Sequence, residues 1–187
     1  TYTLSLHDAL PISLPSIPVT AETVALSTIL IMARETGARL HIARLSSAEG
    51  VAMVRDARAR GLPVTCDVGI HHAHLSEMDI GYFDPNCNLM PPLRSQRDRD
   101  ALRQGLLDGT VDALVSDHSP VDEDAKTLPF AEAEPGATGV ELLLGLACKW
   151  GQEQGPSLAQ TLACVSSGPA RVLGAALGPL KDSCGQL

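Results

Sequence analysis

Aromatic residues are scarce in this sequence, at 3% of the chain, although hydrophobic residues of all kinds reach 44%. The core must therefore consist mainly of Leu, Ala, Val and Ile, a composition typical of helices packed on parallel strands. The chain also lacks a clustered basic segment, and its net charge is −8. Because nucleic-acid binding requires a clustered basic surface, we expect no nucleic-acid partner.

Paired cysteines and long apolar runs are lacking as well. The five cysteines are an odd number at wide spacing, without a C-x-x-C motif. This pattern argues against a disulfide framework and a zinc knuckle, and it favours a reducing cytoplasm. No apolar run has the roughly 20 residues of a membrane span, and the first residues lack the features of a secretory signal. We therefore expect a cytoplasmic protein without a membrane partner.

What the chain does contain is an alternation of strands and helices. Short apolar segments predict strands over residues 39–45, 62–68 and 111–116. Amphipathic segments predict helices over 20–36, 46–60, 95–108, 140–154, 157–165 and 167–173. Strand, helix and strand recur at about 25 residues, which is the spacing of a right-handed parallel βαβ unit. The length favours one domain, or part of a larger one.

Three helix starts have candidate caps in the sequence. Thr20 precedes the first helix, and a Gly at 37 follows it. Two pairs have the spacing of a capping box, Ser46 with Glu49 and Thr138 with Glu141. We expect these residues to satisfy the free amides of the helices that follow them.

Asp117 and His118 follow the predicted strand 111–116 and are the sharpest candidate for chemistry. In α/β barrels the catalytic groups lie at the C-terminal ends of strands. The loop that follows, residues 119–137, is long enough to be functional. The alternative is structural, because an Asp after a strand can simply cap the next turn.

Other polar residues have weaker patterns. His71, His72 and His74 could bind a metal at the end of a strand, or could belong to a polar loop at a barrel mouth. Strand alternation places His41 and Arg44 on opposite faces, so we expect them not to share a site. The arginines between Arg94 and Arg103 alternate with acidic residues and predict a solvated, ion-paired helix face.

Five segments together resemble a known family. They read, in order, HIARLSSAEG, GLPVTCDVGIHHAHL, NLMPPLRSQRDRDALRQGLLDGTVDALVSDHSP, PGATGVELLLGL and SSGPARVLG. In this order and spacing the chain resembles the C-terminal half of the bacterial dihydroorotases, members of the amidohydrolase superfamily. The similarity extends over about residues 14–178. The combination is much more specific than any single short motif.

The resemblance implies an α/β fold, namely the C-terminal part of a TIM-barrel (β/α)8 domain. Such a barrel needs roughly 250 residues, so we expect an incomplete barrel and a fragment of a longer protein. Residues 1–13 do not resemble the family and are expected to be a disordered leader. Residues 14–178 would form the partial barrel, and residues 179–187 would begin a truncated C-terminal segment.

The resemblance also implies an activity. Dihydroorotases use metal, with zinc as the expected ion, to interconvert carbamoyl-aspartate and dihydroorotate in pyrimidine synthesis, so the partner would be a small-molecule substrate. Asp117 matches the aspartate that binds metal and carries the proton in the family. Pro135 and Gly136 match a loop whose backbone approaches the substrate.

Three positions depart from the family pattern. Arg44 stands where the family has a metal-binding His, Met90 where it commonly has Asn, and Val121 where it has a substrate-contacting His. A guanidinium cannot bind a divalent metal. Two interpretations therefore remain open: a dihydroorotase-type enzyme, or an inactive homologue that serves as a structural partner of aspartate carbamoyltransferase. We do not expect the fragment alone to be active.

Overall fold

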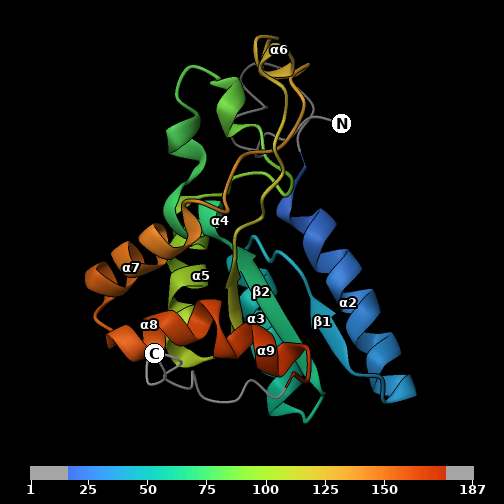
Figure 1. Cartoon of the computed structure of the whole chain (residues 1–187). Helices are drawn as coiled ribbons and strands as arrows, with labels where there is room; N and C mark the ends of the chain where they lie inside the picture. Colours follow the sequence, from blue (N-terminus) through green and yellow to red (C-terminus); the bar gives the residue numbers. More distant parts are fainter. Residues whose placement is uncertain (1–16, 176–187) are drawn as a thin grey trace, which may run out of the picture.

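The computed structural model describes residues 17–175, so the expected segments 1–13 and 179–187 lie outside the described residues. Three strands form one sheet in the order β1-β2-β3, and both neighbouring pairs are parallel (Figure 1). The predicted parallel βαβ units are therefore confirmed. The strands are shorter than predicted, and they are β1 (Leu40–Ile42), β2 (Val64–Gly69) and β3 (Ala113–Val115).

Helices connect and cover these strands. They are α2 (Val19–Thr36), α3 (Ala48–Ala59), α4 (Ile70–His74), α5 (Gln96–Asp108), α6 (Glu123–Lys126), α7 (Leu143–Gln154), α8 (Leu158–Val165) and α9 (Ser167–Val172), with 3-10 helices η1 (Glu77–Ile80) and η2 (Pro85–Cys87). No helix within residues 17–175 combines the length and hydrophobicity needed to cross a membrane. The long loops and α6 gather at the end of the sheet where the strands finish (Figure 1).

Two of the predicted helix boundaries are confirmed by their caps. Ser95 forms a capping box with Asp98 at the start of α5, and Gly109 ends that helix with a left-handed φ of 77°. Ser157 forms a second capping box with Gln160 at the start of α8. In each case a side-chain oxygen accepts a backbone N–H that the helix itself leaves free.

The predicted end of α2 at Gly37 is confirmed by its left-handed φ of 69°, but the predicted N-caps of α2 and α3 are wrong. Helix α2 already begins at Val19, with Pro18 as its N-cap, so Thr20 lies inside it. The N-cap of α3 is Ser47, whose side chain accepts from the backbone N–H of Gly50. The hydroxyl of Ser46 instead donates to the Glu22 carboxylate at 2.5 Å. A tertiary partner has therefore replaced the local capping box.

The predicted start of α7 is also wrong. No side chain caps this helix, which begins at Leu143 after Leu142, three residues later than predicted. The preceding segment packs so closely on the exit of β3 that a Cβ at Gly139 would overlap the carbonyl oxygen of Ser116. The chain must pass this contact before it can turn into a helix, and Thr138 and Glu141 are left outside.

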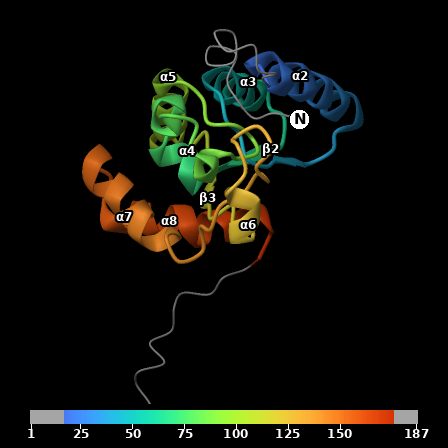
Figure 2. The same cartoon turned by 90° about the horizontal axis from the view of Figure 1, so that it is seen from above.

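The helices form layers on the two sides of the sheet. Figure 2 shows α2, α3 and α5 in a row on one side, with α7 and α8 on the opposite side. Helix α3 packs on both α2 and α5, and α8 and α9 pack on β3. The main core lies between these elements and includes Leu26, Leu45, Val51, Val54, Val64, Cys66, Val68, Ile70, Leu102, Leu106, Leu114, Ala147 and Trp150. A second apolar cluster, Ile80, Leu89, Leu93 and Phe130, anchors the loops beyond the strand ends.

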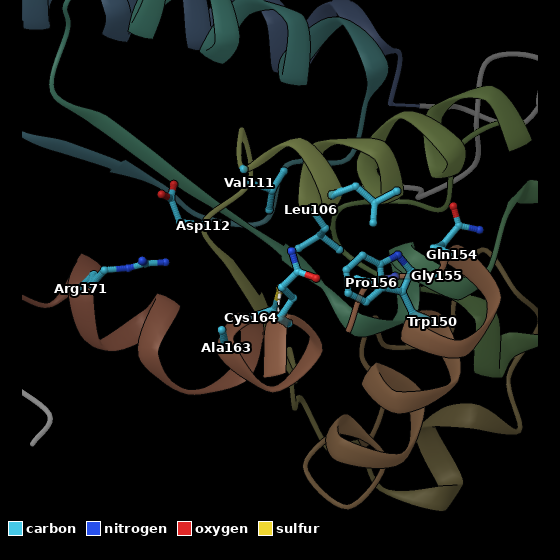
Figure 3. Close-up of a pocket in the computed structure, with 13 residues that line it drawn as sticks. Leu106, Val111, Asp112, Trp150, Gln154, Gly155, Pro156, Ala163, Cys164 and Arg171 are labelled. Atoms are coloured by element: carbon cyan, nitrogen blue, oxygen red, sulfur yellow. Dashed lines mark hydrogen bonds between the residues drawn. The ribbon is translucent and has the colours of Figure 1, made fainter. Parts of the chain in front are cut away.

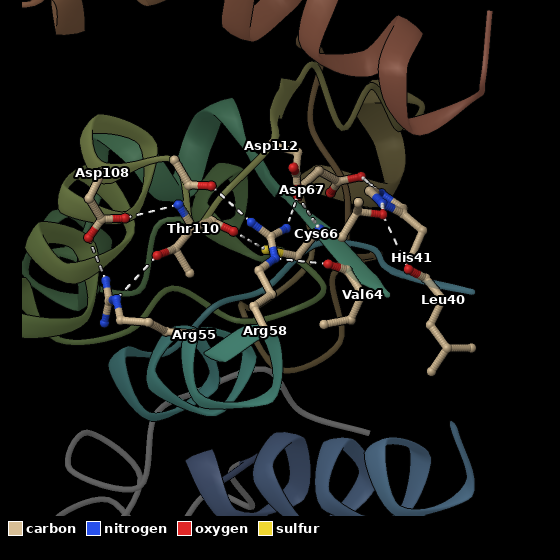
Figure 4. A network of polar contacts seen from close by, with 12 residues as sticks. Leu40, His41, Arg55, Arg58, Val64, Cys66, Asp67, Asp108, Thr110 and Asp112 are labelled. Carbon is tan, nitrogen blue, oxygen red and sulfur yellow. Dashed lines mark hydrogen bonds and ion pairs between the residues drawn. The ribbon is translucent and has the colours of Figure 1, made fainter. Parts of the chain in front are cut away.

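A polar network joins α3 to the start of β2 and to the residues that precede β3 (Figure 4). Arg58 donates to the carbonyl oxygens of Val64 and Gly109, at 2.8 and 2.9 Å, and pairs with the Asp112 carboxylate. The same carboxylate accepts the backbone N–H of Cys66. Burial raises the pKa of the Cys66 thiol to about 12, so this cysteine is a packing residue.

The expected solvated arginine face is only partly right. Arg97 and Arg99 do pair with acidic residues near the surface. Arg94 and Arg103 are buried, however, at 5% and 9% exposure. Arg103 pairs with Glu153 of α7, so the alternating charges of α5 also serve to dock a neighbouring helix.

Candidate functional site

The C-terminal ends of the three strands bring the candidate residues together. Arg44 follows β1, Gly69 ends β2 and Asp117 follows β3. Nη1 of Arg44 lies 3.3 Å from Oδ1 of Asp117. A Cβ placed on Gly69 would lie 3.3 Å from the Cβ of Asp117. Parallel strands end at one edge, so residues far apart in the sequence meet there.

Arg44 is the central cation of this site. Its Nη1 donates to the carbonyl oxygen of Met90 at 3.0 Å as well as to Asp117. The Asp117 side chain is 14% exposed and that of Arg44 is 45% exposed. A cavity of about 290 Å³ lies beside them, lined partly by Arg44, Met90, Pro91 and Pro92. The Arg44 side chain thus contacts Asp117 while nearly half of it remains exposed.

His41 and Arg44, which were expected not to share a site, are joined through the Asp67 carboxylate. Oδ1 of Asp67 accepts the backbone N–H of Arg44 at 2.7 Å, and Oδ2 lies 2.8 Å from Nε2 of His41. Strand alternation fails because Arg44 lies beyond the end of β1 and has a left-handed φ of 57°. Asp67 was missed in the sequence. An Asp inside an otherwise buried strand was the available signal, because a buried carboxylate needs partners.

The three histidines after β2 do not converge on one point. They lie in the short helix α4 rather than on an extended strand. Nε2 of His72 donates to the Pro91 carbonyl oxygen, and Nε2 of His74 donates to the Leu146 carbonyl oxygen, each at 2.9 Å. Nε2 of His71 is buried and has no hydrogen-bond partner. Each ring therefore faces a different segment of the chain.

His72 lies close to Asp117, across Gly69. A Cβ on Gly69 would lie 3.3 Å from Nδ1 of His72 and 3.4 Å from Oδ2 of Asp117, so both groups flank this glycine. Burial lowers the pKa of His72, while its bond to Pro91 and the charge of Asp117 oppose that shift. Burial also lowers the pKa of His71. Both imidazoles are therefore neutral near pH 7.

The residues matched to the substrate loop lie beside the exit of β3. Gly136 donates its N–H to the Asn88 carbonyl oxygen at 2.9 Å, and Val121 packs next to it. Pro135 is exposed. His118 turns towards the start of the α7 region, where its Nδ1 accepts the N–H of Gly139 at 3.1 Å. His118 is thus held by backbone contacts and does not form an acid–base pair with Asp117.

The residues around Asp117 do not fit a divalent metal. Within residues 17–175 there is no group of three or more His, Cys, Asp or Glu side chains that could hold a metal ion. A guanidinium occupies the place beside Oδ1 of Asp117 where a metal ligand would be needed, and a guanidinium only donates hydrogen bonds. The side chains described around Asp117 therefore do not by themselves make up a metal site.

A larger pocket lies away from this site. It has a volume of about 360 Å³ and opens between α5, α7 and α8 (Figure 3). Val111 and Asp112 line it, and they precede β3, whereas Asp117 follows that strand. The pocket is thus at the opposite end of β3, and none of the candidate site residues lines it.

The chain is similar in sequence to known proteins. No family model matches it. It is 44% identical over 162 residues to a dihydroorotase-like protein of Pseudomonas aeruginosa, covering 87% of this chain and 38% of that protein. It is 38% identical over 170 residues to a dihydroorotase of Geobacter sp., covering 91% of this chain and 40% of the relative. The chain therefore spans about two fifths of the length of these curated relatives.

Solved structures agree on the fold. An L-hydantoinase (dihydropyrimidinase) from Arthrobacter aurescens matches with a TM-score of 0.78 and 28% identity, covering 84% of this chain and 36% of that one. A dihydroorotase from Saccharomyces cerevisiae matches with a TM-score of 0.74 at 16% identity, covering 84% and 44%. Over most of its length the chain is thus a relative of the dihydroorotases, and it has the fold of part of a TIM-barrel amidohydrolase.

Proposed function

We propose that the protein that contains this chain takes part in the dihydroorotase step of pyrimidine synthesis, in which carbamoyl-aspartate and dihydroorotate interconvert. Identities of 38 to 44% to curated relatives named dihydroorotase or dihydroorotase-like support this assignment. The position of Asp117 after β3 supports it as well, because TIM-barrel enzymes place catalytic groups there. Within this assignment, two roles differ in their chemistry.

The first role is that of an enzyme acting on a cyclic amide. Asp117 would then carry the proton, and Pro135 and Gly136 would approach the substrate through their backbone. In such an enzyme, Asp117→Asn should lower turnover by roughly 10²- to 10⁴-fold, because the amide cannot accept a proton. Steady-state cyclisation of carbamoyl-aspartate measures this effect, and an unchanged rate would remove Asp117 from the mechanism.

The second role is that of an inactive homologue that acts as a structural partner of aspartate carbamoyltransferase. One observation favours it, namely the contact between Nη1 of Arg44 and Oδ1 of Asp117 at 3.3 Å. This contact uses the Asp117 carboxylate in an ion pair where the resemblance implies a zinc ligand. Met90 and Val121 also replace polar residues of the family pattern with apolar ones. The geometry around Asp117 therefore supports the second role best.

Two measurements on the purified protein separate the roles. The enzyme role predicts cyclisation of carbamoyl-aspartate, which should cease after Asp117→Asn. The structural role predicts no cyclisation and a complex with aspartate carbamoyltransferase of the same organism, measured by light scattering after size exclusion. Turnover by the unmodified protein would contradict the role that we favour, and so would the absence of any complex at micromolar concentrations of both proteins.

A further inference from the structure

We infer that Arg44 is an internal cation that replaces a metal ion beside Asp117, and that Asp67 and His41 hold it in this position. The inference rests on the structural role proposed above. It goes beyond that role because it assigns specific functions to three residues. Arg44 neutralises Asp117, and Asp67 and His41 position Arg44. Four observations on Arg44, Asp67, His41 and Asp117 support it.

The first observation is the backbone of Arg44. Its φ of 57° lies in the left-handed region, which residues other than Gly, Asn and Asp rarely adopt. Such a conformation persists only where surrounding contacts enforce it. Here the backbone N–H of Arg44 donates to Oδ1 of Asp67 at 2.7 Å, a charge-assisted hydrogen bond.

The second observation is the support of Asp67 itself. Its other oxygen, Oδ2, lies 2.8 Å from Nε2 of His41. The second ring nitrogen of His41, Nδ1, lies 2.9 Å from the hydroxyl of Thr65. Both ring nitrogens are therefore engaged, and they fix the Asp67 carboxylate between β1 and β2.

The third observation is the reach of the guanidinium. Nη1 of Arg44 contacts the carbonyl oxygen of Met90 at 3.0 Å and Oδ1 of Asp117 at 3.3 Å. One side chain thus joins the segments that follow β1 and β3 to the loop that contains Met90. A metal ion holds protein segments together in the same way, by binding ligands from several of them.

The fourth observation concerns charge. Asp117 is largely buried, with 14% of its side chain exposed, and a buried carboxylate needs a cation or several donors. Arg44 supplies a cation that contacts it. A divalent ion bound to the same carboxylate would lie within a few ångströms of the guanidinium and would be repelled by it. The Arg44 cation and a metal ion are therefore alternatives at this site.

A double-mutant cycle in the unmodified protein background tests the inference. Arg44→Met, Asp117→Asn and the double variant are compared by the equilibrium constant of unfolding in urea. We expect the two single effects to be non-additive by about 2- to 5-fold, as for a partly exposed ion pair. Additive effects would overturn the inference, because the pair would then contribute nothing as a pair.

The cycle is then repeated with Asp67→Asn, which keeps the shape of the side chain but removes its charge. If Asp67 positions Arg44, the coupling between Arg44 and Asp117 should fall towards zero. Arg97 and Glu49 provide the matched control, because this pair lies at 3.4 Å on the surface with 79% and 46% exposure. The coupling of the control pair should be unchanged by Asp67→Asn. Equal losses in both pairs would show general destabilisation and would overturn the positioning role.

The outcomes also separate this inference from the proposed function. Cyclisation of carbamoyl-aspartate by the unmodified protein would end both, because an active site would then need the metal that Arg44 replaces. An inactive protein with additive effects of Arg44→Met and Asp117→Asn would keep the proposed structural role. In that case only the assignment of Arg44 as the replacing cation would fail.

Discussion

At the residue scale, the site is marked by backbone conformation as well as by charge. Arg44 and Asp117 both have left-handed φ values, 57° and 45°, and they are the two partners of one ion pair. Each such conformation costs about 1–2 kcal/mol for an L-residue. The fold tolerates this cost at the two positions that follow parallel strands, where both side chains are turned towards the same point.

This strain predicts an order of stability among Arg44 variants. Arg44→Gly and Arg44→Ala both remove the guanidinium, but only Gly adopts a positive φ without a steric penalty. We expect Arg44→Gly to be the more stable of the two by roughly 0.5–1 kcal/mol, after allowing for the greater chain entropy of unfolded Gly. Urea unfolding of both variants measures the difference. If the Ala variant proved equal or better, the left-handed conformation of residue 44 would be refuted.

A second residue-scale prediction concerns Arg44→His. The change removes the replacing cation and supplies the imidazole that the family pattern has at this position. We expect the variant to bind zinc more tightly than the unmodified protein by at least about 10-fold, a factor that corresponds to one first-shell or supporting ligand. Calorimetric titration with zinc measures this gain. Equal affinities would show that the remaining geometry no longer suits a metal.

Part of this site could be predicted from the sequence. Asp117 was found because it follows an apolar strand and carries the family pattern, and Arg44 was found because it departs from that pattern. Their contact was not predicted, because it depends on the backbone conformation of Arg44. A positive φ at an arginine leaves no mark in the sequence, and the carboxylate that enforces it, Asp67, comes from the next strand.

At the scale of elements, α4 carries buried titratable groups close to the site. Burial lowers the pKa of His71, His72 and His74 in the folded chain, whereas in the unfolded chain each titrates near 6.5. Below that pH the unfolded state binds more protons than the folded state. Protonation therefore favours unfolding, and the stability supplied by the neutral rings is lost as the pH falls.

We accordingly expect the free energy of unfolding to be constant above about pH 7.5 and to fall below pH 6.5. His72 is the most buried of the three and should contribute up to about 1.4 kcal/mol per pH unit in the falling range. Urea unfolding at pH 7.5 and 5.5 measures the slope, which His72→Gln should reduce. A slope that is the same in His72→Gln would assign the pH dependence to other groups.

Helix α7 offers a second test at this scale, in the segment that leads into it. A Cβ at Gly139 would overlap the backbone oxygen of Ser116, whereas Gly145 has open space around it. Gly139→Ala should therefore lower the free energy of unfolding by roughly 1–3 kcal/mol, and Gly145→Ala should raise it by up to about 1 kcal/mol. Thermal unfolding compares the two variants. Similar effects at both positions would contradict the close contact between residue 139 and the exit of β3.

Competition from residues distant in the sequence decides which helix starts could be predicted. The predicted helix starts at Ser95 and Ser157 are confirmed, because each depends on a capping box between neighbouring residues. Those at Ser46 and Thr138 fail because partners distant in the sequence compete. The Glu22 carboxylate takes the hydroxyl of Ser46, and the Ser116 carbonyl fixes the chain at Gly139.

At the scale of the whole molecule, the described residues form a three-stranded parallel sheet with helices on both sides, as part of a TIM barrel would. The alternation of strands and helices was enough to predict parallel βαβ units, and the family resemblance was needed to place them in a barrel. The chain spans about two fifths of the length of its curated relatives, so the function of the whole protein is a proposal. The central claim about this protein is that Arg44 has replaced a metal ion at the C-terminal ends of the strands.

Metal content tests that claim most directly. The purified protein, unmodified and without prior exposure to chelators, is analysed for zinc by mass spectrometry after growth in zinc-supplemented medium. The account predicts a zinc content far below one ion per chain, because the Arg44 guanidinium already neutralises Asp117. One zinc ion or more per chain, lost when Asp117 is changed to Asn, would contradict it.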